Sequence, residues 1–202
     1  MAPNFASLAF TPEIKSLQEK HGGRVGYECM EKRMAANGLS ENEIGFIGNR
    51  DSFYVTSIGE NGFPYIQQRA GPKGFVKVLD IHTLVFIDFS SNKQYISVGN
   101  LATHKNVSII VVDYASRSRL KIYAKAEVVE LKDRPDLLEA LTLENYTYKP
   151  ERMMVLKIES YDWNCPQDLT PRYTAEEIEE ALIPQREYMR KLEKGIKALK
   201  SK

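Results

Sequence analysis

The chain has 202 residues, of which 43% are hydrophobic, and its 28 basic and 27 acidic residues leave a formal net charge of +1. This length is expected to form one domain with a sizeable core. The balanced charge removes any electrostatic argument for binding nucleic acid or an anionic membrane surface. Two distant cysteines, Cys29 and Cys165, make neither a disulfide framework nor a zinc site and favour a reducing compartment.

No segment has the pattern of a membrane span or a targeting signal. The apolar runs all stay below the roughly 18 residues that a spanning helix needs. Residues 1–10 lack the basic flank and the long apolar core of a signal peptide. We therefore expect a cytoplasmic protein without a membrane segment.

The first fifty residues predict three helices. Thr11-Pro12-Glu13 forms a helix start, because threonine caps, proline fits the first turn and glutamate complements the helix dipole. Gly22-Gly23 ends that helix, and a second helix is expected over residues 24–36. Ser40 and Glu43 have the spacing of a capping box and predict a third helix. We expect these helices to serve as structural cover.

Residues 51–130 predict a series of strands. Asp51–Ile58 is rich in aromatic and β-branched residues, and Asn61-Gly62 suits a turn with positive φ. Further strands are expected at 63–69, 75–79, 83–88, 106–114 and 120–130, with a short helix at Gln94–Leu101. Several short strands at close spacing, separated by turn signals, predict a sandwich or a barrel.

The rest of the chain predicts two helices and one more strand. Arg134-Pro135-Asp136 opens a helix, and residues 153–158 alternate like a strand that gives way to an irregular segment at 161–167. A Thr-x-x-Glu pattern at 174–177 is a second capping box. It predicts a final helix from about Ala175 to Leu199.

Familiar catalytic and metal patterns are weak. His21, His82 and His104 are far apart in the sequence and are expected at the surface, not as metal ligands. Cys29 lies in a helical pattern and is expected to be buried. The Gly71–Gly74 segment is too short and wrongly placed for a phosphate-binding P-loop.

Polar and basic residues lie at the ends of the apolar strands and between them. Arg69 and Lys77 flank the Gly71–Gly74 interruption, and Ser90–Lys93 forms a turn that enters a short helix. Hydroxyls, a lysine and free backbone amides at a helix N-terminus suit a phosphate group. A solvated turn with charges at strand edges explains the same pattern, since lysine commonly guards sheet edges. These residues alone leave both interpretations open.

Four stretches of the sequence carry a family resemblance. They are residues 16–24, 51–80 with its Phe63-Pro-Tyr-Ile-Gln-Gln-Arg core, 89–101 (Phe-Ser-Ser-Asn-Lys-Gln-Tyr-Ile-Ser-Val-Gly-Asn-Leu) and 161–167 (Tyr-Asp-Trp-Asn-Cys-Pro-Gln). Together they resemble the pyridoxamine 5'-phosphate oxidase-related FMN-binding proteins, and the resemblance covers nearly the whole chain.

This resemblance implies a mainly β fold with helices (α+β). The sheet would be a six-stranded antiparallel Greek-key split β-barrel that binds FMN. Within a single domain, residues 1–50 would form a helical extension, 51–167 the barrel and 168–202 the C-terminal helix. Members of the family are usually homodimers with the flavin at the subunit interface.

The resemblance also implies site residues. Lys77 corresponds to the strand lysine that contacts the flavin, and Ser91-Asn92-Lys93 to the turn that grips the FMN phosphate. Asn92 replaces the usual arginine, and Arg69 is expected to compensate for that lost charge. Arg119 falls where the oxidases place a glutamine near the flavin. In full, the expected cofactor-binding residues are Gln67, Gln68, Arg69, Lys77, Ser91, Asn92, Lys93, Gln94, Arg119, Asn164 and Gln167.

Two further residues of the C-terminal motif, Trp163 and Cys165, each allow two interpretations. Trp163 suits a core or interface anchor, and it also suits a cover for the flavin ring. Cys165 would be redox-active only if it were exposed near the flavin, and otherwise an isolated cysteine is inert packing.

The leading functional interpretation is an FMN-dependent oxidoreductase that transfers a hydride at flavin N5. Arg69 or Arg119 would stabilise the reduced flavin, and a nicotinamide or another small molecule would serve as the donor. Oxidation of pyridoxamine 5'-phosphate itself is not expected, because the oxidases read it with an Arg-x-His pattern and no histidine follows His104. Two alternatives are a non-catalytic FMN carrier or sensor, and a split-barrel protein that binds haem or a deazaflavin.

Overall fold

The computed structural model describes residues 4–32, 37–90, 92–143 and 146–200. The chain divides into two compact units. The first comprises Met1–Asp113 with Ser118–Pro166 and contains the sheet, and the second comprises Tyr114–Arg117 with Gln167–Lys202 and contains the final helix. Among the described residues, no helix combines the length and the apolar character needed to cross a membrane.

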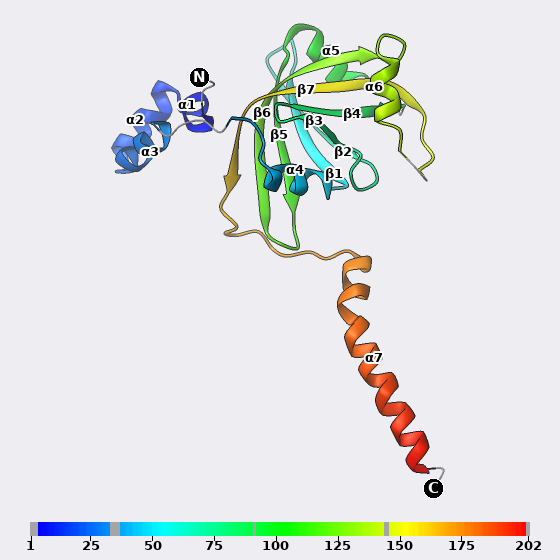
Figure 1. Ribbon diagram of the computed structural model, residues 1–202. Helices are drawn as coiled ribbons and strands as arrows, with labels where there is room; N and C mark the ends of the chain where they lie inside the picture. Colours follow the sequence, from blue (N-terminus) through cyan, green and yellow to red (C-terminus); the bar gives the residue numbers. More distant parts are fainter. Residues whose placement is uncertain (1–3, 33–36, 91, 144–145, 201–202) are drawn as a thin grey trace. The chain divides into compact units, whose positions relative to one another are not determined.

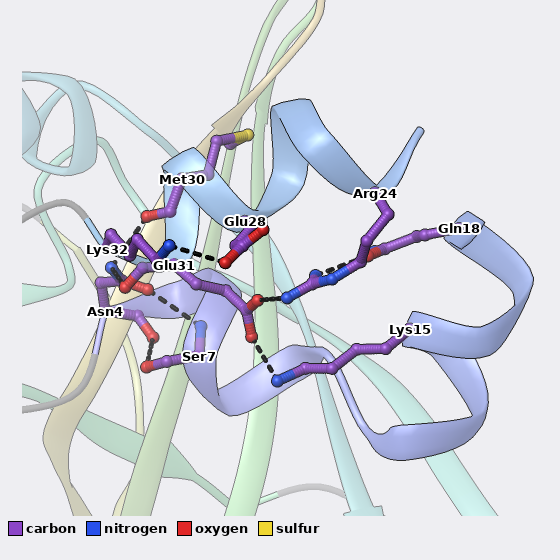
Figure 2. Close-up of polar contacts among 9 residues, drawn as sticks. All are labelled: Asn4, Ser7, Lys15, Gln18, Arg24, Glu28, Met30, Glu31 and Lys32. Atoms are coloured by element: carbon purple, nitrogen blue, oxygen red, sulfur yellow. Dashed lines mark hydrogen bonds and ion pairs between the residues drawn. The ribbon is translucent and has the colours of Figure 1, made fainter. Parts of the chain in front are cut away.

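Three short helices precede the sheet: α1 (Phe5–Ala9), α2 (Pro12–Lys20) and α3 (Arg24–Glu31). Figure 2 shows that Asn4 ties two of them together. Its side-chain oxygen accepts from the amide of Ser7 at 2.9 Å, and its amide nitrogen donates to the carbonyls of Met30 and Glu31 at 3.0 and 2.9 Å. One side chain thus caps the start of α1 and the end of α3, where backbone groups lack helical partners.

Ion pairs also hold the α1–α3 segment together. Glu31 forms an ion pair with Lys15 at 2.7 Å and another with Arg24 (Figure 2). The hydrogen bond from Lys15, and then that from Arg24, lowers the pKa of Glu31. The ring of Phe5 stacks on that of Tyr123 with centroids 4.6 Å apart, which anchors α1 to the sheet.

These helices confirm part of the prediction and correct part of it. Helix α2 begins at Pro12 as expected, while α1 was not predicted because five residues give too little periodicity. Residues 33–36 of the second predicted helix lie outside the described residues. Cys29 is exposed, not buried, because α3 buries none of its residues. The three histidines are exposed as expected.

One antiparallel sheet dominates the first unit. Within the described residues it has seven strands, in the order β2-β1-β5-β6-β7-β4-β3 (Figure 1). The strands are β1 (Ser52–Ile58), β2 (Pro64–Ala70), β3 (Lys77–Asp80), β4 (Thr83–Phe89), β5 (Asn106–Asp113), β6 (Ser118–Glu130) and β7 (Pro150–Asn164). All seven coincide with strands that the residue pattern predicts. The resemblance implied six, and the short edge strand β3 makes the difference.

The topology contains the predicted Greek key. Strands β5, β6 and β7 are neighbours in sequence order, and β4 returns to lie beside β7. Their inner faces meet in a core, to which Phe53, Leu84, Ile109, Ile122 and Leu156 contribute from five different strands. Figure 1 shows the strands curling around this shared interior.

Three helices complete this unit of the chain. Helix α4 (Glu41–Gly48) buries Ile47 in the main core, and α5 (Ile96–Thr103) adds Leu101 to it. Helix α6 (Pro135–Ala140) belongs to a second cluster, in which Leu137 packs with Val85 and Met153 on the other face of β4 and β7. The sheet is therefore apolar on both faces along β4, as its continuous apolar run predicts.

Strand β7 is longer than predicted, because polar contacts to α4 hold its C-terminal end. Residues 161–164 were expected to be irregular, yet they pair with β6. Trp163 Nε1 donates to Glu43 of α4 at 2.7 Å, and the Tyr161 hydroxyl lies 3.3 Å from the same carboxylate. Phe46 packs edge-on against Trp163 with centroids 4.8 Å apart. The inward alternation of Tyr161 and Trp163 thus keeps the strand regular, and it makes Trp163 a core anchor.

Glu43 stabilises both the start of α4 and the end of β7. It completes the predicted capping box by accepting from the amide of Ser40 at 2.9 Å, and it receives Trp163. Burial would raise the pKa of this carboxyl, but the hydrogen bonds from Ser40 and Trp163 outweigh burial and lower the pKa to about 2.

We predict that Glu43 makes stability depend on acid pH. Since its folded pKa lies below the ordinary value of 4.5, its contribution is complete above about pH 4.5 and is lost as the pH falls toward 2. Its size is roughly 2 to 3 kcal/mol. Urea unfolding of the wild type and of Glu43→Gln, measured from pH 6 to pH 2.5, should show that the difference between them shrinks at low pH. A difference that is constant with pH would contradict this assignment.

The second unit contains α7 (Ala175–Lys200), which begins as the second capping box predicts. The amide of Thr174 donates to the Glu177 carboxylate at 2.8 Å, and the amide of Glu177 donates back to the Thr174 hydroxyl at 3.2 Å. Pro184 lies inside the helix, and α7 buries none of its residues.

Candidate cofactor site

A small polar pocket, with a cavity volume of about 40 Å³, lies where β2, β4, β7 and the first turn of α5 meet. Its lining consists of Tyr65, Gln67, Arg69, Asp88, Phe89, Asn92, Lys93, Gln94, Tyr95, Ile96, Ser97, Val98, Glu151 and Arg152. It therefore brings together five of the predicted residues: Gln67, Arg69, Asn92, Lys93 and Gln94.

Strand alternation decides which residues of β2 reach the pocket. Gln67 and Arg69 are half-buried and line it, whereas Gln68 points to the exposed face of this edge strand. The side-chain oxygen of Gln67 accepts from the Ser97 hydroxyl at 2.7 Å, which links β2 to the start of α5. Gln68 is thus separated from the other predicted residues by the two-residue period of a strand.

A buried carboxylate organises the charges of the pocket. Asp88 is 5% exposed and pairs with Arg69 at 2.5 Å and with Arg152 at 3.6 Å. Burial raises the pKa of Asp88, although both guanidinium groups act in the opposite direction. Since Arg69 is on β2 and Asp88 on β4, this pair joins one edge strand to the strand beside the other edge.

The network continues from Arg152 to the turn before α5. Arg152 also pairs with Glu151 at 2.7 Å, and its guanidinium lies 4.8 Å from the centre of the Tyr95 ring. The Tyr95 hydroxyl donates to Glu151 at 2.6 Å, and this hydrogen bond raises the pKa of Tyr95. These contacts fix the backbone that leads into α5.

Two sets of hydrogen-bond donors border the pocket. Nε of Arg69 is buried and has no hydrogen-bond partner in the described part of the chain. The N-cap residue of α5, Tyr95, provides no side-chain cap for the first-turn amides. Lys93 and Tyr95 both have left-handed backbones, with φ of 59° and 52°. Such strain in residues other than glycine concentrates at ligand-binding turns, and uncapped amides attract anions.

Other predicted residues lie away from this pocket. Lys77 is half-buried on β3 opposite Val85 of β4, and it does not line the pocket. Ser91 lies outside the described residues, and Gln167 belongs to the other unit.

Arg119 and Asn164 face each other across β6 and β7, and Arg119 donates to the carbonyl of Cys165. Asn164 is separated from Arg152 by twelve residues of β7, about 40 Å in a straight strand. Neither Arg119 nor Asn164 lines the pocket of its own chain.

The pocket also contains nine residues that the sequence did not predict, and four of them carry its charge network: Asp88, Tyr95, Glu151 and Arg152. A signal for two of them was present, because Asp88 ends the apolar run Leu84–Ile87 and Arg152 precedes the apolar run 153–156. A charge inside a buried strand needs a partner of opposite charge. In the described residues, no cluster of three or more histidine, cysteine, aspartate or glutamate side chains could hold a metal ion.

The sequence model of the Pyridoxamine 5'-phosphate oxidase family matches residues 41–161, which include α4, α5, α6 and nearly the whole sheet. The chain belongs to this family. The match begins at α4 and ends at Tyr161, so the pocket falls entirely within it. A search of curated proteins found no match.

Several solved structures are similar to the chain at low sequence identity. HupZ from Group A Streptococcus is 15% identical, with a TM-score of 0.47 over 67% of this chain and 99% of that one. A protein from Clostridium acetobutylicum related to general stress protein 26 is 15% identical, with a TM-score of 0.45 over 61% and 85% of the two chains. An FMN-binding protein from Syntrophomonas wolfei is 14% identical, with a TM-score of 0.47 over 76% and 97%.

We predict that Asp88→Asn lowers the free energy of unfolding by about 3 kcal/mol, because it leaves two largely buried guanidinium groups without their shared anion. Urea denaturation at pH 7 measures this. The matched control is Asp136→Asn, which removes an exposed pair with Arg134 and should have a much smaller effect. Equal effects of the two substitutions would show that Asp88 is not a structural anchor.

Proposed function

We propose that this protein is an FMN-dependent oxidoreductase whose pocket between β2, β4, β7 and α5 binds the phosphate and ribityl part of the flavin. The observation that carries the proposal is the convergence of Arg69, Lys93 and the uncapped first turn of α5 on one polar pocket. When bound, FMN supplies hydride chemistry at its N5 atom. The protein's contribution is to bind and orient it.

The donors of the pocket suit a phosphate dianion. Lys93 supplies a point charge from an exposed turn, and Arg69 supplies a guanidinium held in place by Asp88. The amides of Ile96, Ser97 and Val98 at the start of α5 add uncharged donors with the favourable end of the helix dipole. Gln67 and Gln94 provide amide groups for the ribityl hydroxyls.

The pocket's own charges explain how Asn92 is tolerated where the family's oxidases have an arginine. Three cations, Arg69, Lys93 and Arg152, line the pocket against two anions, Asp88 and Glu151. The net charge is therefore positive without a third arginine. We propose that Arg69 supplies the charge that the replaced arginine would have given.

A polar pocket covers only one end of FMN, so the flavin ring needs a second surface. We propose that a second copy of the chain provides it in a homodimer. Support comes from Arg119 and Asn164, which lie together on β6 and β7 at the end of β7 remote from the pocket of their own chain. In this arrangement, Arg119 of one copy lies near the ring held by the other.

The first test is flavin binding. We expect purified protein to show flavin absorbance bands, with about one FMN per chain after addition of the cofactor. Lys93→Ala should weaken FMN binding by about tenfold to a hundredfold, because a charge-assisted contact to the phosphate is lost. The control Lys132→Ala removes an exposed lysine outside the pocket and should change nothing. Absence of any flavin binding would refute the proposal.

The second test is reduction. Anaerobic addition of NADH or NADPH to the FMN-loaded protein should bleach the flavin band at 450 nm within a catalytic time scale, about one second to a minute. If the flavin binds but neither nicotinamide nor a small-molecule donor bleaches it, the protein is a carrier and the oxidoreductase assignment fails.

The shared site has its own test. Lys93→Ala damages the pocket, and Arg119→Ala damages the surface that a second copy contributes. When the two variants are unfolded together and refolded, heterodimers should regain one intact site each, about a quarter of all sites. No gain over the separate variants would contradict a site built from two copies.

A further inference from the structure

Helix α7 carries an apolar seam with a period of seven residues. With Ala175 at the first position, the a and d positions of the heptads are Ala175, Ile178, Leu182, Gln185, Met189, Leu192, Ile196 and Leu199. Seven of these eight are apolar, and the repeat persists for more than three heptads. A sustained a and d pattern is the mark of a coiled-coil strand.

This seam has no cover within its own unit. Helix α7 has 26 residues and is about 39 Å long, yet none of its residues is buried. Leu192, Ile196 and Leu199 are 43%, 53% and 75% exposed. Most helices in proteins owe their stability to the packing of an apolar face. Pro184 is at a c position, so its ring lies outside the seam, although it removes one backbone hydrogen bond from the helix interior.

The charges along α7 select the orientation of its partner. Its first two turns carry four glutamates, and its second half is rich in lysine and arginine. Two parallel copies would place these acidic turns together. Their flanking g and e positions would pair Ala181 with Arg186, Tyr188 with Glu193 and Gly195 with Lys200, none of which is an opposite-charge pair. Two antiparallel copies would place the acidic half against the basic half.

The e positions flank the seam and are occupied by Glu179, Arg186, Glu193 and Lys200. Their charges also select one antiparallel register. With Met189 opposite Leu192 of a second copy, Glu179 faces Lys200 and Arg186 faces Glu193, and each pair occurs twice by symmetry.

Shifting this register by one heptad creates repulsion in either direction. One shift places Glu179 opposite Glu193 and Arg186 opposite its own copy. The other places Arg186 opposite Lys200 and Glu193 opposite its own copy. Like-charge contacts of this kind discriminate against wrong pairings.

From this complementarity we propose that α7 forms an antiparallel two-stranded coiled coil with the α7 of a second copy of the chain, in the register that pairs Arg186 with Glu193. This contact is separate from the flavin pocket, and it holds whether or not the protein binds FMN. It gives the second unit of the chain the apolar cover that it lacks.

Cysteine cross-linking of the full chain tests the pairing. The exposed Cys29 and Cys165 are first replaced by serine. In that background, Glu179→Cys with Lys200→Cys should give disulfide-linked dimers under mild oxidation. Each single variant should give at least about tenfold fewer, because equivalent residues of an antiparallel pair are separated by about 30 Å. No linked dimer in the double variant, or equal linking in the single variants, would overturn the proposal.

Charge exchange tests the register with the same readout. Adding Arg186→Glu to the double-cysteine variant sets like charges opposite each other at Glu193 and should slow cross-linking by about tenfold. Adding Glu193→Arg as well should restore the rate, because the pair is then reversed and again complementary. The control Arg190→Glu makes the same charge change at an outer b position and should have a smaller effect. Failure of the double exchange to restore cross-linking would overturn the register.

Discussion

The fold of the first unit depends on a carboxylate buried between two guanidinium groups. The sheet has two edges, β2 and β3, and a curled sheet must bring them near each other without pairing them. Asp88 on β4 does this by holding Arg69 of β2, while Arg152 on β7 supports it from the neighbouring strand. Because a buried charge is tolerated only with its partners, this contact restrains the sheet at its opening. The same contact places Arg69 in the pocket.

A second buried acid, Glu43, has a comparable role at the end of β7. It is fully supplied with donors by Ser40, Trp163 and Tyr161, which is why its pKa is low, whereas that of Asp88 is raised. Hydrogen bonds from the backbone and from neutral groups stabilise the charge on Glu43, whereas burial dominates at Asp88 despite two cations. Glu43 fixes a helix cap and a strand, while Asp88 is part of a site that still has an unpartnered donor, Nε of Arg69.

Under the proposed function, the pocket is a phosphate site with little net charge. Arg69 and Arg152 are already paired, so they contribute position and direction more than free charge. Lys93 and the first turn of α5 then supply donors in an open turn held by Tyr95 and Glu151. A site of this kind would orient a dianion through donor geometry, and the neighbouring carboxylates reduce the repulsion between the cations.

The sequence by itself determined the elements and the family. Capping boxes at Ser40 and Thr174, the Asn61-Gly62 turn and the short β-rich runs each act within a few residues, so local chemistry identified the starts of α4 and α7 and all seven strands. The motifs at 63–80 and 89–101 identified the family and five residues of the pocket.

Tertiary structure decided the rest. Only strand alternation separates Gln67 from Gln68, and only the curl of the sheet brings Arg69 to Asp88, 19 residues away. Only packing against Glu43 turns Trp163 into an anchor and keeps residues 161–164 in β7. These outcomes rest on contacts between residues distant in sequence, which no local pattern encodes.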